Sequence, residues 1–351
     1  MKRLSLVIFP LLFLAISSHA PAASQDESPA FQVGEIYYFG YQGVDLKKLQ
    51  ANLPVHIGDT VHPERRGIEW QTIQDTVKQV TGSAPTNIER VCCDESHNLI
   101  LYIGLSGTSS HPFPSTPPPQ GSDRLEEAAL KLYDQQETAM VEAVRRGASG
   151  EDDSRGYAIS KDPATRKIDL AVRVYAVHRG PEFEKVLRNA ADPQQRRVSA
   201  WLLGYADRST AQIQSLAKAA SDADSEVRNN AVRALGVLAS DRNAGPVKID
   251  PGPFIALLFS GQWSDRNKGS LLLEKLTRQR DPALLAELRH EAFQPLIEGA
   301  GWDPGHAGFF LLILGRIANL PEDRLRKLID AHDTDQIIRA AEHTPTTARL
   351  P

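Results

Sequence analysis

The chain has 351 residues, of which 41% are hydrophobic, and its formal net charge at pH 7 is −4. This length suggests about two domains with cores of their own. The acidic balance argues against nucleic acid or an anionic membrane as a partner, since binding to either depends on a basic surface.

The first 22 residues resemble a secretory signal peptide. Lys2 and Arg3 precede an apolar run from Leu4 to Ile16, and Ala20-Pro21-Ala22 supplies a small-residue cleavage site. The run is shorter than the roughly 20 residues of a membrane span. An uncleaved anchor is the alternative. Cleavage would leave a chain two charges more negative.

No later segment reaches the length of a membrane span. The closest, residues 307–320, is short and contains Arg316. We therefore expect an exported protein with no integral membrane segment after signal cleavage. We expect the protein to be located in the periplasm, and secretion from the cell is the alternative.

Residues 32–105 predict a small α+β domain. Glycines bracket a β-rich run at 36–39. Asp45 is placed to cap a helix over 45–54, and Trp70, Ile73, Val77 and Val80 share one face of a second helix over 65–82. Two further β-rich runs, 87–93 and 98–105, flank a polar turn and predict a hairpin.

The order strand–helix–helix–strand–strand, with the passage "GDTVHPERRGIEW" at 58–70, resembles a POTRA (polypeptide-transport-associated) domain. The resemblance implies capture of a partner strand at a sheet edge. Other small α+β domains share this order and remain an alternative.

The two cysteines, Cys92 and Cys93, are adjacent. In a strand they would point to opposite faces, which is the ordinary interpretation. A vicinal disulfide and a redox-active or intermolecular thiol are the alternatives, because export makes disulfides feasible. Neither cysteine has a sequence partner that marks it as a nucleophile.

Residues 106–123 contain five prolines among Ser, Thr and Gly. Such a composition predicts a semi-extended spacer. We expect it to separate the α+β domain from a helical domain over 124–345.

The helical part repeats itself. "DPQQRRVSAWLLGYAD" at 192 and "DSEVRNNAVRALGVLA" at 224 are 32 residues apart, and each predicts an amphipathic helix behind an aspartate. The matched positions are an Asp, an Arg four residues later, a Leu and a Gly: Asp192, Arg196, Leu203, Gly204 and Asp224, Arg228, Leu235, Gly236.

Each matched residue type has a physical role. The Asp carboxylate can cap the first helical turn, and the Gly allows a neighbouring helix to approach closely. For Arg196 and Arg228 we favour pairing with an aspartate of the next repeat, and contact with a ligand is the alternative. Looser copies are expected from Asp265, with Gly269 at the Arg position, and from Asp303, with Ala307 at the Arg position and Gly315 at the Gly position.

These copies resemble HEAT-type repeats, especially the short variety of the phycobilisome (bilin) lyases. The resemblance implies an α-solenoid over about 160–345, in which no helix pair buries its apolar face alone. It also implies, as one alternative, a carbon–sulfur lyase or isomerase acting on a tetrapyrrole.

No motif predicts catalysis, a cofactor or a metal. His290-Glu291 lacks the second His of H-E-x-x-H. His56, His62, Asp59 and Glu64 share a loop but lack the spacing of a zinc site. At the start of a helix, His306 is expected to have a packing role.

The sequence therefore predicts an exported, non-enzymatic scaffold that binds unknown protein partners through a HEAT-repeat solenoid. An accessory factor in outer-membrane protein assembly or secretion, acting through the POTRA-like domain, is one alternative. A lyase or isomerase of the bilin lyase class is the other.

Overall fold

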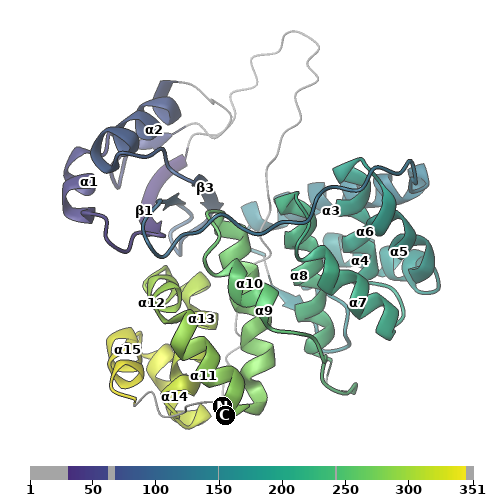
Figure 1. Cartoon of the computed structure of the whole chain (residues 1–351). Coiled ribbons are helices and arrows are strands. Elements are labelled where there is room, and N and C mark those ends of the chain that lie inside the picture. The colour runs from purple at the N-terminus through teal and green to yellow at the C-terminus, as the bar shows by residue number, and fades with distance from the viewer. Residues whose placement is uncertain (1–30, 62–67, 149, 242, 345–351) are drawn as a thin grey trace.

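A computed structural model describes residues 31–61, 68–148, 150–241 and 243–344 (Figure 1). The predicted signal peptide, together with His62 and Glu64, lies outside these residues. Among the described residues no helix combines the length and apolar character that crossing a bilayer requires.

The N-terminal part is a four-stranded sheet with two helices. Its order is β2-β1-β4-β3, in which β1 pairs parallel with β4, and β2 and β3 pair antiparallel with their neighbours. The strands are β1 (Phe31–Phe39), β2 (Thr60–Val61), β3 (Asn87–Cys92) and β4 (Leu99–Gly104). The predicted order of strands and helices is therefore observed, with the two-residue β2 added to it.

Helices α1 (Leu46–Asn52) and α2 (Ile68–Thr81) cover one face of this sheet. Asp45 caps α1 by accepting a hydrogen bond from the Lys48 backbone N–H, and Gly82 follows α2 with a left-handed φ of 85°. The core between sheet and helices contains Leu49, Ile73, Val77, Leu101 and Ile103.

The opposite face of the sheet packs against the helical part. Successive strand residues point to opposite faces, and Phe39, Val91, Ile100 and Tyr102 join a hydrophobic cluster with residues of the C-terminal helices. Strand β4 is consequently buried on both faces along its whole length. The two parts of the chain are thus in direct contact.

Thirteen helices follow in the described part of the chain, with one short hairpin, β5 (Glu151–Asp152) and β6 (Ile159–Ser160), between the first two. The helices are α3 (Glu127–Arg145), α4 (Pro163–Ala176), α5 (Gly180–Asn189), α6 (Pro193–Leu203), α7 (Thr210–Ala219), α8 (Ser225–Ala239), α9 (Gly252–Leu257), α10 (Trp263–Leu276), α11 (Pro282–Glu291), α12 (Phe293–Ala300), α13 (Pro304–Ile317), α14 (Glu322–Asp330) and α15 (Thr334–Glu342).

The helices stack in two layers. Helices α6, α8, α10 and α13 pack side by side in one layer, and α5, α7 and α9 pack against them in the other. Each helix from α3 to α15 contributes to a single hydrophobic cluster. This shared interior is what the repeated sequence predicts, because one helix pair alone cannot bury its apolar face.

Residues 106–123 contain no helix or strand, but they are not a spacer between separate modules. The His111 backbone N–H donates to the Phe259 carbonyl, Thr116 N–H donates to the Ser221 carbonyl, and Gly121 pairs with Asn189 and Ala191. The segment crosses the helical stack from α10 toward α3 (Figure 1). We call it the strap. The sequence predicts a spacer between two modules, whereas these hydrogen bonds hold the segment against the helical stack.

Candidate binding surface

An arginine ladder connects successive repeats of the helical stack. Arg196 donates two hydrogen bonds to Asp222, both at 2.8 Å, and also donates to the carbonyls of Ala190 and Ala191. Both partners are almost completely buried. This bidentate geometry is the strongest form of an arginine–carboxylate pair.

Arg228 repeats the arrangement one helix later. It donates to both carboxylate oxygens of Asp265, at 2.9 and 2.7 Å, and to the carbonyls of Asp222 and Ala223. Arg196 and Arg228 therefore link helices, as the pairing interpretation of the repeat requires. Their guanidinium groups are occupied by the fold.

The third copy is shifted relative to the sequence-based alignment. Helix α10 begins at Trp263 behind Gln262, so Asp265 lies inside the first turn and is not the cap. The residue four positions after the cap is Arg266, not Gly269. Arg266 donates to the Ser260 carbonyl and pairs with Glu298 at 3.0 Å. The alignment on Asp265 and Gly269 was wrong because it took an aspartate that pairs with Arg228 for a capping residue.

The other capping residues lie where the sequence predicts them. Asp192 accepts from Gln194 N–H, Asp224 from Glu226 and Val227 N–H, and Asp303 from Gly305 N–H. Behind them, Leu203 and Leu235 are fully buried.

The three matched glycines lie at close approaches between helices. A Cβ added to Gly204 would contact Ala234 of α8, one on Gly236 would overlap Leu271 of α10, and one on Gly315 would overlap Leu325 of α14. Glycine is needed there for space, since a larger residue would push the next helix away.

The ladder ends on the N-terminal sheet. Glu298 accepts from the Gly40 backbone N–H at 2.7 Å and from the Ser109 hydroxyl, while it pairs with Arg266. Arg266 also donates to the Ser109 carbonyl. One buried carboxylate thus joins the sheet, the strap and the helical stack.

A second polar contact fixes the sheet on the helices. The Tyr102 hydroxyl donates to Asp303 at 2.5 Å, and His306 Nδ1 lies 2.6 Å from the same carboxylate. Trp263 and Trp302 surround the Tyr102 ring, with centroids 4.9 and 5.2 Å away. Burial raises the pKa of Tyr102 well above its usual value, so the phenol remains a donor. His306 therefore has the packing role that the sequence predicts.

Helices α6, α8 and α10 share a row of mainly polar residues at matching positions, of which Arg197, Glu226 and Arg233 are partly exposed and the others are buried. Counted from the residue that caps each helix, these residues lie at the fifth, sixth or ninth position, and two of them lie at the second position. This spacing places them on one face of each helix. We call this set the polar face: Arg197 and Trp201; Glu226, Asn229, Asn230 and Arg233; Ser264, Asn267 and Lys268.

One end of the polar face is acidic. Glu226 of α8 lies within electrostatic range of Glu137 of α3 and of Glu89 of β3. The Glu89 side chain points to the same side of the sheet as Val91. The pKa of Glu226 is raised to about 8, mainly by burial; the charge of Arg197 lowers it, and the charges of Asp224, Glu89 and Glu137 contribute to the increase. Burial likewise raises the pKa of Glu89 and of Glu137.

The other end carries paired charges. Arg233 pairs with Glu151 of β5, and the Lys268 ammonium lies near both, with 2% of the residue exposed. Burial lowers the pKa of Lys268 to about 7, and the charge of Arg233 acts in the same direction. The polar face therefore carries carboxylates at the start of α8 and paired charges toward its end.

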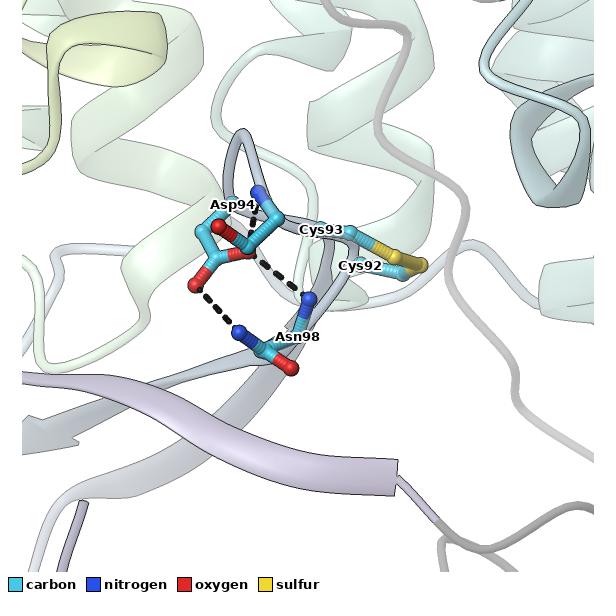
Figure 2. Close-up of a disulfide and its surroundings, with 5 residues drawn as sticks. Cys92, Cys93, Asp94 and Asn98 are labelled. Carbon is cyan, nitrogen blue, oxygen red and sulfur yellow. Dashed lines mark hydrogen bonds between the residues drawn. A yellow bond between two sulfur atoms is a disulfide. The ribbon is translucent and has the colours of Figure 1, made fainter. Parts of the chain in front are cut away.

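Cys92 and Cys93 form a disulfide at the end of β3 (Figure 2). This is the vicinal alternative, and not the pair of opposed strand residues. The following turn is closed by Asp94, whose carboxylate accepts from the N–H groups of Ser96 and Asn98. His97 in this turn approaches Gly147 behind α3.

The histidines of the sequence analysis do not converge on a metal site. His56 lies 3.6 Å from Asp59 on the surface, and His290 lies in the last turn of α11. Among the described residues no group of three His, Cys, Asp or Glu side chains could hold a metal ion.

Comparison with known protein families identifies the repeats in one part of the chain. Residues 180–247, which span α5 to α8, match the model of HEAT repeats. The chain contains HEAT repeats. No curated protein matches its sequence significantly. The run of helices around the match is consistent with a HEAT-like solenoid, and HEAT-repeat proteins usually bind other proteins and are typically non-catalytic.

Sequence reasoning missed Arg266 and the acidic end of the polar face. Arg266 could have been recognised from the repeat spacing. It lies four residues after Gln262, a polar residue that directly precedes a helix, just as Arg196 and Arg228 lie four residues after their capping residues. Glu89, Glu137 and Glu226 carry no shared motif. Because β3, α3 and α8 are far apart in the sequence, only tertiary packing brings these charges within range of one another.

Proposed function

We propose that the protein is an exported, non-enzymatic scaffold that binds a protein partner through the polar face of its HEAT repeats. The observation that carries this proposal is the composition of that face, where charged and amide side chains replace apolar ones on the central helices. Stacked repeats present side chains from several helices on one continuous surface. The buried ladder of Arg196, Arg228 and Arg266 supports a preorganised surface, which lowers the entropic cost of binding.

Photo-crosslinking of the full mature chain tests this assignment. A photoreactive residue replaces Gln194, which is exposed two positions behind the α6 cap and next to the polar face. The matched control replaces Gln214, which is exposed on α7 in the other layer. We expect cross-linked partners from position 194 and none from position 214. Equal cross-linking at both positions would reject the polar face as the binding surface.

Export is supported by residues 1–22 and by the disulfide between Cys92 and Cys93, since disulfides persist mainly in oxidising compartments. The test is the mass of the protein recovered from the periplasm or medium. A chain that begins near Ala23 is expected, and an intact N-terminus on all of the protein would contradict cleavage.

A second candidate function, in outer-membrane protein assembly or secretion, is favoured by a groove in the N-terminal sheet. The groove has a volume of about 380 Å³ and lies between edge strand β2 and helix α2, lined by residues that include Val55, Thr60, Val61, Trp70 and Ile73. An edge strand beside an apolar groove suits the addition of a partner strand. If this second function is correct, a photoreactive residue at Ile57, which is 69% exposed, should cross-link the partner, and the photoreactive residue at position 194 should not.

A further inference from the structure

The disulfide between Cys92 and Cys93 closes the shortest loop that two cysteines can form, because the two residues are adjacent. The entropic stabilisation from a disulfide grows with the length of the loop that it closes, so it is smallest for neighbouring residues. The bond also joins no two elements of the fold, since Cys92 ends β3 and Cys93 directly follows it. It therefore contributes little as a structural cross-link.

Other contacts hold this hairpin in place. Cys92 lies opposite Leu99 in the register of β3 with β4. In the turn that follows, the Asp94 backbone N–H donates to the Asn98 carbonyl at 2.9 Å. The Asp94 carboxylate accepts from the N–H groups of Ser96 and Asn98, at 2.8 and 2.7 Å. Because these bonds use groups other than the sulfur atoms, we expect the hairpin to keep its shape when the disulfide opens.

Both cysteines lie at the rim of the sheet. Strand β3 is an edge strand in the order β2-β1-β4-β3, and each cysteine is partly exposed. Figure 2 shows the two sulfur atoms pointing away from the side chains of Asp94 and Asn98. A thiolate from solution reacts with a disulfide only where it reaches a sulfur atom. The partial exposure of both residues on an edge strand favours that access.

The thiol that opens this bond must come from another molecule. The chain has two cysteines, and both are in the disulfide. No thiol of the same chain can therefore reduce or rearrange it. A monothiol bound to one cysteine would be expelled by the neighbouring cysteine, because the two residues are held together by a single peptide unit. Complete reduction therefore requires a donor with a second thiol.

We infer that Cys92 and Cys93 form a redox site that accepts two electrons from a dithiol. One thiolate of the donor attacks a sulfur of the disulfide, the S–S bond breaks, and the other cysteine leaves as a thiolate. The second thiolate of the donor then attacks the mixed disulfide and releases the remaining cysteine. The donor becomes a disulfide, and its two protons are balanced by those that Cys92 and Cys93 take up as thiols. This site goes beyond the scaffold function and does not depend on the polar face.

The direct test compares reduction of the disulfide in the folded chain and in the same full mature chain unfolded in urea. Dithiothreitol and a Cys-Gly-Pro-Cys peptide are the dithiol probes, reduced glutathione is the monothiol probe, and alkylation with mass spectrometry measures the free thiols. We expect each dithiol to reduce the folded chain within about threefold of its rate in urea, because the fold does not shield the bond. Glutathione at the same thiol concentration should leave most of the bond oxidised. The dithiol that reacts faster at equal thiolate concentration indicates whether the donor is a small molecule or a protein.

Reduction of the folded chain that is more than about tenfold slower than in urea would overturn the inference, because it would show a shielded bond. Complete reduction by glutathione, or a stable glutathione adduct, would overturn the requirement for a dithiol.

The double substitution Cys92→Ser with Cys93→Ser provides the structural control. This variant and the reduced parent should both melt within about 3 °C of the oxidised parent, since the bond closes a loop of adjacent residues. A much larger decrease for both would show that the bond is a structural cross-link, and the redox site would then be rejected.

Discussion

At the scale of single residues, burial determines which charges support the fold. Arg228 and Asp265 are both buried, and each satisfies the other with two hydrogen bonds. Glu226 is partly buried without such a partner. A buried pair is costly to break, whereas a buried lone charge is costly to keep. The same helix therefore carries one charge that stabilises the fold and one that does not.

Substitution of Arg228 by Ala should strongly destabilise the protein. Asp265, whose side chain is 0% exposed, would lose its counter-charge and keep only the hydrogen bond from Ser260. The expected loss is about 3–5 kcal/mol, measured by urea unfolding. Arg145→Ala, at an exposed position on α3, is the control and should cost less than about 0.5 kcal/mol. Similar losses for the two variants would show that the ladder contributes little.

Substitution of Glu226 by Gln should stabilise the protein in a pH-dependent way. The folded-state pKa of Glu226 is about 8, above its unfolded value, so folding takes up a proton between about pH 4.5 and 8. Glu226 therefore reduces stability progressively as pH rises through that window. The gain from E226Q should be near zero at pH 4 and about 4 kcal/mol at pH 8, since one pKa unit corresponds to about 1.4 kcal/mol, as measured by thermal unfolding. A pH-independent difference would contradict the raised pKa.

At the scale of helices, spacing is set by glycine. Gly236 faces Leu271, and a methyl group at that position would overlap it. Helix α8 can approach α10 closely only because this side chain is absent. Close approaches at Gly204 and Gly315 explain why the repeated sequence keeps a glycine twelve residues after the capping aspartate.

Substitution of Gly236 by Ala should therefore cost about 1–3 kcal/mol, although Ala favours helices, because α8 and α10 would be forced apart. Gly245→Ala is a suitable control, since nothing lies within 4 Å of the added Cβ. Chemical unfolding of both variants measures the difference. A neutral or stabilising effect of Gly236→Ala would mean that the stack adjusts without loss.

Local features were predictable from sequence and contacts between distant segments were not. Asp192, Asp224 and Asp303 cap helices because capping depends on the next three residues alone. The alignment failed at α10 because the gap between copies grew, so that Arg266 was overlooked. Proline and serine content predicts a segment that forms no packed element, but composition does not encode the carbonyls of Phe259 and Ser221 to which the strap is bonded.

At the scale of the whole molecule, the sheet, strap and helices form one connected structure. Phe39 and Tyr102 of the sheet share a hydrophobic cluster with the helices, and Glu298 joins all three parts by hydrogen bonds. Interfaces that bury apolar surface and satisfy buried charges do not behave as loose tethers. The position of the sheet against the helices is therefore fixed by the fold.

Cleavage of the strap should leave the two parts of the molecule associated. A protease site inserted between Pro117 and Pro118, which are both exposed, divides the strap between its contacts with Ser221 and with Asn189. Because the sheet is held by its own buried face, the cleaved fragments should elute together in size-exclusion chromatography and unfold in one thermal transition. The uncut insertion variant controls for the insertion itself. Separation of the fragments without denaturant would mean that the sheet and the helices are independent modules joined only by the strap.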